Sequence, residues 1–220
     1  MPYKLGLINL NGTLIDDVPL ILASSQHVFH RFAPDIIPPS LDDFRSGTTP
    51  LSDAEWHYRR GIPRTIPHEE IKGVWMRYYE SNSGNICLSD GALRFLSFMR
   101  GCEVRIIIIS EAPRSMKQLV EKLGIINLVD RICFNATDKT SVISHLLTSE
   151  AYRGIQPRKV FFMSDTVNDI VQGNAANVAT FAYVHGLHPL PALKNARPKR
   201  IVHSFRDAVN EVRAQIPEYA

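Results

Sequence analysis

The chain has 220 residues, 45% of them hydrophobic and 21% charged, with a formal net charge of +3. This length suffices for one sizeable core with a smaller insert, or for two small domains. Acidic and basic residues are interspersed, which argues against the clustered basic face of a nucleic-acid-binding or membrane-surface protein. We therefore expect neither nucleic acid nor membrane as a partner.

The cysteines and the apolar segments indicate the compartment. Cys87, Cys102 and Cys133 lie far apart and in no metal-ligand spacing, which argues against a disulfide framework or a zinc site. The apolar run at the amino terminus is short and is broken by Asn9. No other apolar stretch approaches the length of a membrane span, and no cleavage pattern of a signal peptide is present. The sequence predicts a soluble, cytoplasmic protein.

Five short apolar runs are typical of buried strands. The first ends in Asn11-Gly12-Thr13, which is a turn signal, and the second contains four consecutive isoleucines. Continuous apolar strands of this kind are required by a parallel sheet that is covered on both faces. The runs are 4–10, 105–110, 160–163, 180–184 and 200–203.

Stripes of apolar residues at helical spacing lie between and after these runs, within 116–123, 142–151 and 205–216. Ser204 precedes the last stripe as an N-cap residue, with Asp207 three positions later as in a capping box. Alternating strands and helices predict an α/β fold with a doubly wound parallel sheet.

The segment 17–89 has no strand signal. It contains two helical stripes, within 18–32 and 71–78, and it is punctuated by prolines. A crossover between neighbouring strands is usually much shorter. We therefore predict an α/β core formed by 1–16 and 90–220, with a helical insert at 17–89.

Polar residues follow the predicted strands. In open α/β sheets, ligands bind at the carboxyl ends of the strands. A hydroxyl, an ammonium and two carboxylates at one sheet edge suit a phosphate group and a magnesium ion, with Ser and Lys on the phosphate and Asp on the cation. The two aspartates could instead cap the following helix. The residues concerned are Asn9, Asn11, Ser110, Lys139, Asp165 and Asp169.

These segments resemble the motifs of the haloacid dehalogenase superfamily of phosphatases and dehalogenases. Its first motif is an apolar strand followed by DxDGT and then Leu or Val, and residues 9–14 occupy it as Asn-Leu-Asn-Gly-Thr-Leu. Ser110 matches the second motif, Lys139 the third, and 164–169 resembles the acidic fourth. Order and spacing hold over essentially the whole chain. The resemblance implies a Rossmann-like core, with 17–89 as the C1 cap of the phosphoglycolate phosphatase-like branch.

The resemblance also implies a mechanism. The first Asp of the motif attacks phosphorus, and the second protonates the leaving group and later activates water. Mg²⁺ and the Lys neutralise the charge on the transferring phosphoryl group of a small phosphomonoester. Carried onto this chain, the metal positions are Asn9, Asn11, Asp165 and Asp169, and the phosphate positions are Gly12, Ser110 and Lys139.

The chain departs from the motif at both aspartate positions. Asn9 stands where the nucleophile would be and Asn11 where the acid/base would be. An amide is a poor nucleophile and does not shuttle protons near neutral pH, and loss of the nucleophile alone lowers turnover on the order of a millionfold. Because an anionic ligand becomes neutral, magnesium binding is expected to weaken. The sequence predicts a phosphatase-like protein that is inactive as written.

Several alternatives remain at this level. The isosteric replacements are consistent with engineered inactivation and also with a natural protein that still uses the site for binding. The chain could then be a regulatory module for a phosphorylated ligand or a partner. A different chemistry on the same scaffold is a third alternative. Dehalogenation would also need an Asp at position 9.

Overall fold

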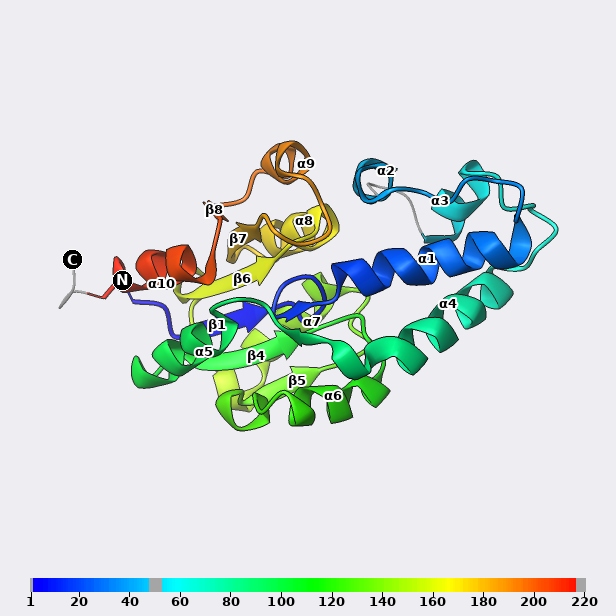
Figure 1. Ribbon diagram of the computed structural model, residues 1–220. Helices are drawn as coiled ribbons and strands as arrows, with labels where there is room; N and C mark the ends of the chain where they lie inside the picture. The colour runs from blue at the N-terminus through cyan, green and yellow to red at the C-terminus, as the bar shows by residue number, and fades with distance from the viewer. Residues whose placement is uncertain (1, 48–52, 217–220) are drawn as a thin grey trace. The chain divides into compact units, whose positions relative to one another are not determined.

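Figure 1 draws the computed structural model, which describes residues 2–47 and 53–216. The chain divides into two compact units. One comprises the residues up to Asp16 together with those from Cys87 onward, and the other spans Asp17–Ile86. The first unit is built on a sheet and the second is helical.

The sheet of the first unit has six strands in the order β5-β4-β1-β6-β7-β8, and all neighbouring pairs are parallel. The predicted α/β fold with a doubly wound parallel sheet is therefore confirmed. The strands are β1 (Leu5–Ile8), β4 (Arg105–Ile109), β5 (Arg131–Cys133), β6 (Val160–Ser164), β7 (Ala179–Tyr183) and β8 (Arg200–Val202).

Strand β1 occupies the centre of this sheet. Leu5 is in register with Arg105 of β4 on one side and with Val160 of β6 on the other. The chain builds β4 and β5 on one side of β1 and then returns to build β6, β7 and β8 on the other side. The carboxyl end of β1 is therefore the topological switch point, where open α/β sheets bind their ligands.

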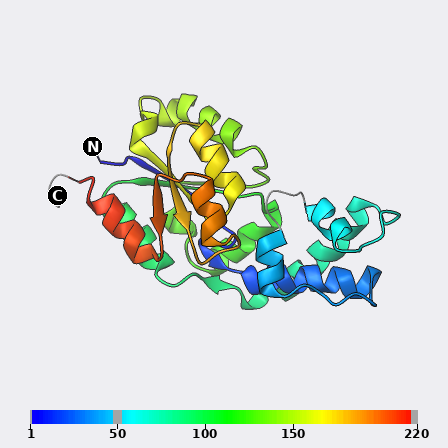
Figure 2. The same ribbon diagram turned by 90° about the horizontal axis from the view of Figure 1, so that it is seen from above.

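Helices cover both faces of the sheet (Figure 2). Leu5, Leu7 and Phe162 pack on one face against Ile143 and Leu146 of α7, and α8 covers the same face. On the other face, Phe161 contacts Phe95 of α5, which in turn meets Phe205 of α10. The helices of this unit are α5 (Ala92–Gly101), α6 (Lys117–Lys122), α7 (Lys139–Thr148), α8 (Val167–Ala175), α9 (Leu190–Asn195) and α10 (Phe205–Arg213).

The start of α10 agrees with its sequence signal. Ser204 Oγ accepts a hydrogen bond of 3.1 Å from the backbone N–H of Asp207, so Ser204 is the N-cap residue as predicted. Asp207 Oδ2 accepts from the backbone N–H of His203 at 2.9 Å. Together these bonds satisfy two backbone donors before the helix ladder begins.

The helical unit pairs its two long helices, α1 and α4, side by side (Figure 1). Two side-chain hydrogen bonds join these helices. The Tyr79 hydroxyl donates to Asp17 Oδ2 at 2.5 Å, and Trp75 Nε1 donates to Ser25 Oγ at 3.1 Å. These bonds tie α4 to the first half of α1. The helices are α1 (Val18–Phe32), α2 (Leu41–Gly47), α3 (Asp53–Arg59) and α4 (His68–Asn82).

The boundary between the units lies at a two-stranded ribbon. Strand β2 (Ile15–Asp16) pairs with β3 (Cys87–Leu88) in antiparallel fashion, and Ser89 N–H donates to the Leu14 carbonyl at 2.9 Å. Residues 87–89, which we expected in the insert, therefore belong to the sheet-based unit. A strand of two residues leaves no hydrophobic period in the sequence, which is why the pattern did not reveal it.

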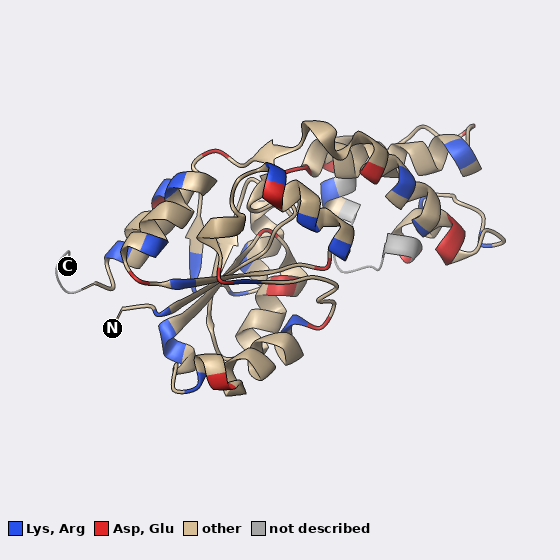
Figure 3. Cartoon of the chain, turned by 90° about the horizontal axis from the view of Figure 1, so that it is seen from below, with Lys and Arg blue, Asp and Glu red and all other residues tan. Residues whose placement is uncertain are grey.

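Charges of both signs are scattered along the ribbon (Figure 3). Within 2–47 and 53–216, no helix combines the length and the apolar character that a membrane crossing needs. Cys87, Cys102 and Cys133 are free thiols.

Candidate functional site

The seven residues singled out in the sequence meet at the carboxyl edge of the sheet. Asn9 follows β1 directly, Ser110 follows β4, and Asp165 follows β6. Lys139 is the first residue of α7 and Asp169 lies in the first turn of α8. The strand order explains this convergence, because β1, β4 and β6 are adjacent strands whose ends share one edge.

Asn9 lies at the centre of the cluster and is buried. Its Nδ2 donates to the backbone carbonyl of Asn11 at 2.8 Å and to Asp165 Oδ1 at 3.2 Å. Its Oδ1 accepts from Lys139 Nζ at 3.3 Å. The amide therefore uses its donor side and its acceptor side at the same time.

Asn11 is held from the neighbouring strand. Ser110 Oγ donates to Asn11 Oδ1 at 3.1 Å and accepts from the backbone N–H of Ala112 at 3.0 Å. A β-bridge joins Asn11 to Ile15. The bridge and the hydroxyl fix the position of the Asn11 backbone carbonyl that Asn9 contacts.

Asp165 is enclosed by donors and by glycine. Oδ1 accepts from Asn9 Nδ2 and from the Thr13 hydroxyl at 2.7 Å, and Oδ2 accepts from the Leu187 N–H at 2.8 Å. A Cβ at Gly12 would lie 2.3 Å from Asp165 Oδ2, so only glycine fits there. Gly12 also has a φ of 66°, in the left-handed region that glycine adopts readily.

Burial sets the ionisation of this carboxyl group. It raises the pKa of Asp165 above its ordinary value, although the hydrogen bonds from Leu187 and Thr13 act in the opposite direction. The nearby negative charge of Asp169 raises the pKa further. Hydrogen bonds from protein groups, rather than from solvent, hold this carboxyl group in place.

Lys139 and Asp169 form a buried ion pair. Nζ lies 2.6 Å from both carboxylate oxygens, and Asp169 Oδ2 also accepts from the Ser164 hydroxyl at 2.6 Å. In addition, Gln172 Oε1 accepts a hydrogen bond from the backbone N–H of Lys139 at 2.5 Å. The side chain of Gln172, in α8, therefore anchors the start of α7 beside the site.

The alternative that Asp165 and Asp169 only cap a helix is wrong. The N-cap residue of α8 is Thr166, whose side chain accepts from the backbone N–H of Asp169 at 3.3 Å. Both carboxylates are directed instead into the network around Asn9 and Lys139.

Some members of the network were not singled out from the sequence. Thr13 and Ser164 lie inside the motifs, so their spacing could have indicated them. Gly186, Leu187 and His188 come from the loop after β7, which has no motif. A Cβ on Gly186 would lie 2.1 Å from Asp165 Cβ, and His188 N–H donates to the Asp165 carbonyl at 3.2 Å.

A magnesium ion at this edge would need several oxygen ligands in near-octahedral geometry. Two oxygens converge beside Asn9, namely the Asn11 carbonyl and Asp165 Oδ1. Both already accept hydrogen bonds from Asn9 Nδ2. Asp169, the other carboxylate, is paired with Lys139. Among the described residues, no three His, Cys, Asp or Glu side chains gather as a metal site. As arranged, these side chains do not fit Mg²⁺.

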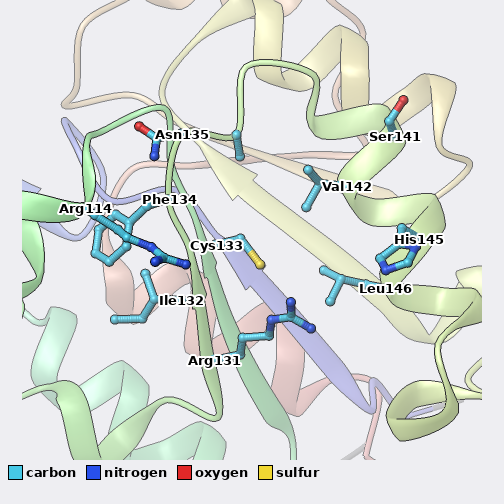
Figure 4. Close-up of a pocket in the computed structure, with 11 residues that line it drawn as sticks. Arg114, Arg131, Ile132, Cys133, Phe134, Asn135, Ser141, Val142, His145 and Leu146 are labelled. Carbon is cyan, nitrogen blue, oxygen red and sulfur yellow. The ribbon is translucent and has the colours of Figure 1, made fainter.

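A separate cavity of about 420 Å³ lies between the end of β5 and α7 (Figure 4). None of the seven site residues lines it. Sequence reasoning gave no hint of it, because the strand β5 that forms one wall was not predicted. The lining residues are Arg114, Arg131, Ile132, Cys133, Phe134, Asn135, Ala136, Ser141, Val142, His145 and Leu146.

Several solved structures share the architecture of this chain. A phosphoglycolate phosphatase predicted for Haemophilus somnus superposes with a TM-score of 0.78 at 17% identity, covering 95% of this chain and 97% of that one. A haloacid dehalogenase-like hydrolase from Streptococcus pneumoniae gives a TM-score of 0.79 at 17% identity, with coverages of 95% and 98%. At these identities the likeness concerns the fold.

Sequence comparison assigns the family. Phosphoglycolate phosphatase 1 of Pseudomonas aeruginosa is 22% identical to this chain over 215 residues, which cover 93% of the chain and 78% of that protein. The family model of haloacid dehalogenase-like hydrolases matches residues 7–183. The resemblance seen in the motifs is thereby confirmed, and the chain belongs to the haloacid dehalogenase-like hydrolases, on a phosphatase-like branch.

Proposed function

We propose that this chain binds a small phosphomonoester on a phosphatase scaffold and does not hydrolyse it. One observation carries the proposal. Asn9 and Asn11 stand at the two positions where the motif has aspartates, and the rest of the network is assembled around them.

The absence of chemistry follows from the amide group. The lone pair of an amide nitrogen is delocalised into the carbonyl, so Asn9 offers no nucleophile for phosphorus. Its Nδ2 is moreover directed at two acceptor oxygens and not outward. Asn11 has no titratable proton near neutral pH, so it neither protonates a leaving group nor activates water.

Retention of phosphate binding is supported by the donors that remain. Lys139, which is paired with Asp169, supplies an ammonium group, Ser110 supplies a hydroxyl, and the glycine turn at Gly12 follows Asn9 and Asn11 directly. Two amides in place of two carboxylates also remove repulsion towards an incoming dianion. The names of the relatives, two phosphoglycolate phosphatases, support a small phosphorylated ligand.

Two measurements test the proposal. Calorimetry with inorganic phosphate and with 2-phosphoglycolate should show binding that Lys139→Ala weakens. Lys117→Ala is the control, because Lys117 is an exposed lysine that pairs only with Glu121 among the described residues. Binding that is unchanged by Lys139→Ala would place the anion elsewhere.

The second measurement is a phosphatase assay on the same preparations. No turnover above background is expected with either ligand. Hydrolysis that persists through purification and disappears in Lys139→Ala would show that the chain is an active enzyme and would overturn the proposal.

A further inference from the structure

The orientation of the Asn9 amide is fixed by chemistry. Lys139 Nζ is donor-only, so the amide atom 3.3 Å from it must be the oxygen. The Asn11 carbonyl is acceptor-only, so the amide atom 2.8 Å from it must be the nitrogen. Rotating the amide by half a turn would oppose donor to donor at Lys139 and acceptor to acceptor at Asn11.

The two hydrogens of Nδ2 therefore point at two particular oxygens, the Asn11 backbone carbonyl and Asp165 Oδ1. The family motif implies that a cation would join these same oxygens, together with the side chain at position 9. In this chain the side chain at position 9 supplies partial positive charge to them directly. The bridging role is already filled from within the protein.

The charge balance of the cluster agrees with this geometry. Asp169 is neutralised by Lys139 at 2.6 Å. Asp165 is the remaining carboxylate, and it already receives hydrogen bonds from Asn9, Thr13 and the Leu187 backbone. A divalent cation would find only one carboxylate ligand here that has no positive partner, Asp165, and it would have to displace the Asn9 N–H group to reach it.

We propose that Asn9 Nδ2 takes the place of the divalent cation, so that this site holds its anionic ligand without Mg²⁺. The ligand half of this inference rests on the proposed function, whereas the metal half stands on the network alone. Position 9 thus decides metal dependence: an amide gives a metal-independent site, and a carboxylate gives a metal-dependent one.

The metal half is tested with Mn²⁺, whose free ion is measured by electron paramagnetic resonance, and with Mg²⁺ by calorimetry. The protein as it stands should show no saturable binding at this site. Asn9→Asp should bind either ion more tightly by about tenfold or more, and Asp165→Asn in that background should abolish the gain. Asn11→Asp is the matched control, because it adds the same charge next to Ser110 but leaves the Asn9 donor in place.

Saturable Mn²⁺ binding to the unaltered protein that Asp165→Asn removes would overturn the inference. So would an Asn11→Asp variant that gains metal as strongly as Asn9→Asp. Thermal unfolding of each variant checks that it is folded, and Asn9→Ser provides a second variant that removes the amide without adding charge. It should lose both hydrogen bonds of Asn9 Nδ2 and still bind no metal tightly.

The ligand half is tested by titrating inorganic phosphate in the presence of a chelator and again with Mg²⁺. The affinity of the unaltered protein should be the same in both, whereas Asn9→Asp should bind phosphate only with Mg²⁺. Phosphate binding that requires Mg²⁺ in the unaltered protein would overturn this inference and leave the proposed function intact. If phosphate fails to bind under either condition, the proposed function fails, and the Mn²⁺ titration decides the metal half by itself.

Discussion

Lys139 Nζ lies at 2.6 Å from both carboxylate oxygens of Asp169, and both side chains are almost fully buried. The pair joins the first residue of α7 to the first turn of α8. A symmetric contact of this kind neutralises each charge in a place where water is largely excluded. Removal of either partner would leave the other charged and without compensation.

Lys139→Met should therefore destabilise the protein by about 3–5 kcal/mol, because the Asp169 carboxylate would keep the Ser164 hydroxyl as a donor but would lose its positive partner. Lys139→Met combined with Asp169→Leu should recover most of that loss. Urea unfolding of the single and double variants measures the coupling. The exposed pair Lys117–Glu121 is the control, where Lys117→Met should change stability by less than about 1 kcal/mol.

Restoring the two carboxylates should restore chemistry. Asn9→Asp with Asn11→Asp is expected to give magnesium-dependent hydrolysis of small phosphomonoesters, because the nucleophile and the proton shuttle act as one unit. Each single variant should be far less active. Asn9→Asp alone is expected to accumulate a phosphoaspartate, which intact-protein mass spectrometry would detect. A folded double variant that stays inert over sugar, nucleotide and short-acid phosphates would contradict the expectation.

Gly186→Ala should disturb the site without replacing any of its polar groups. The new Cβ would lie 2.1 Å from Asp165 Cβ and 2.4 Å from Asp165 Oδ2, so the carboxylate must shift. We expect a loss of about 1–3 kcal/mol from overpacking together with weaker phosphate binding. Gly101→Ala is the control, since nothing lies within 4 Å of the added atom and the position is helical. It should be neutral or slightly stabilising.

His188 makes stability depend on pH. Burial lowers the pKa of His188 from 6.5 to about 4, against the opposing effect of the Asp169 charge. The folded protein thus favours neutral His188, whose Nδ1 accepts from the Val167 N–H at 2.8 Å. This contribution is complete above pH 6.5 and is lost as the pH falls from 6.5 towards 4, by about 3 kcal/mol.

His188→Gln keeps an acceptor for Val167 but does not titrate. The unfolding free energy of this variant should therefore fall less steeply between pH 6.5 and 4 than that of the unaltered protein. Superimposable pH profiles for the two proteins would show that His188 is not the group responsible.

The central strands were predictable because they are buried on both faces. In β4, Ile106–Ile109 are fully buried, and the sequence shows them as an unbroken apolar run. Strand β5 (Arg131–Cys133) lies at the sheet edge with exposed and half-buried residues, so it leaves no such run. Helix α8 gave no apolar stripe in the sequence, because its start is occupied by the polar residues of the fourth motif, and a helix there entered only as the one that the two aspartates could cap.

The site residues were predictable as a set, because each follows a strand or begins a helix at the same sheet edge. Their contacts were not predictable. The sequence assigned Asp169 to a magnesium ion, yet the structure pairs it with the ammonium group of Lys139. The direction in which the Asn9 amide points depends on distances across three elements. Pairwise geometry of this kind is absent from residue order alone.

The ribbon of β2 and β3 has a consequence for modularity. Asp16 and Cys87, the last and first residues of the sheet-based unit at the break, are hydrogen-bonded neighbours in an antiparallel pair. Strands paired in this way are readily joined by a tight two-residue turn such as Asn-Gly. The whole of Asp17–Ile86 could therefore be exchanged for such a turn, or for a helical insert of another length, without stretching the chain at the splice. Recombination at this one junction gives evolution, or a protein engineer, a way to change the helical unit while leaving the strands of the sheet in register.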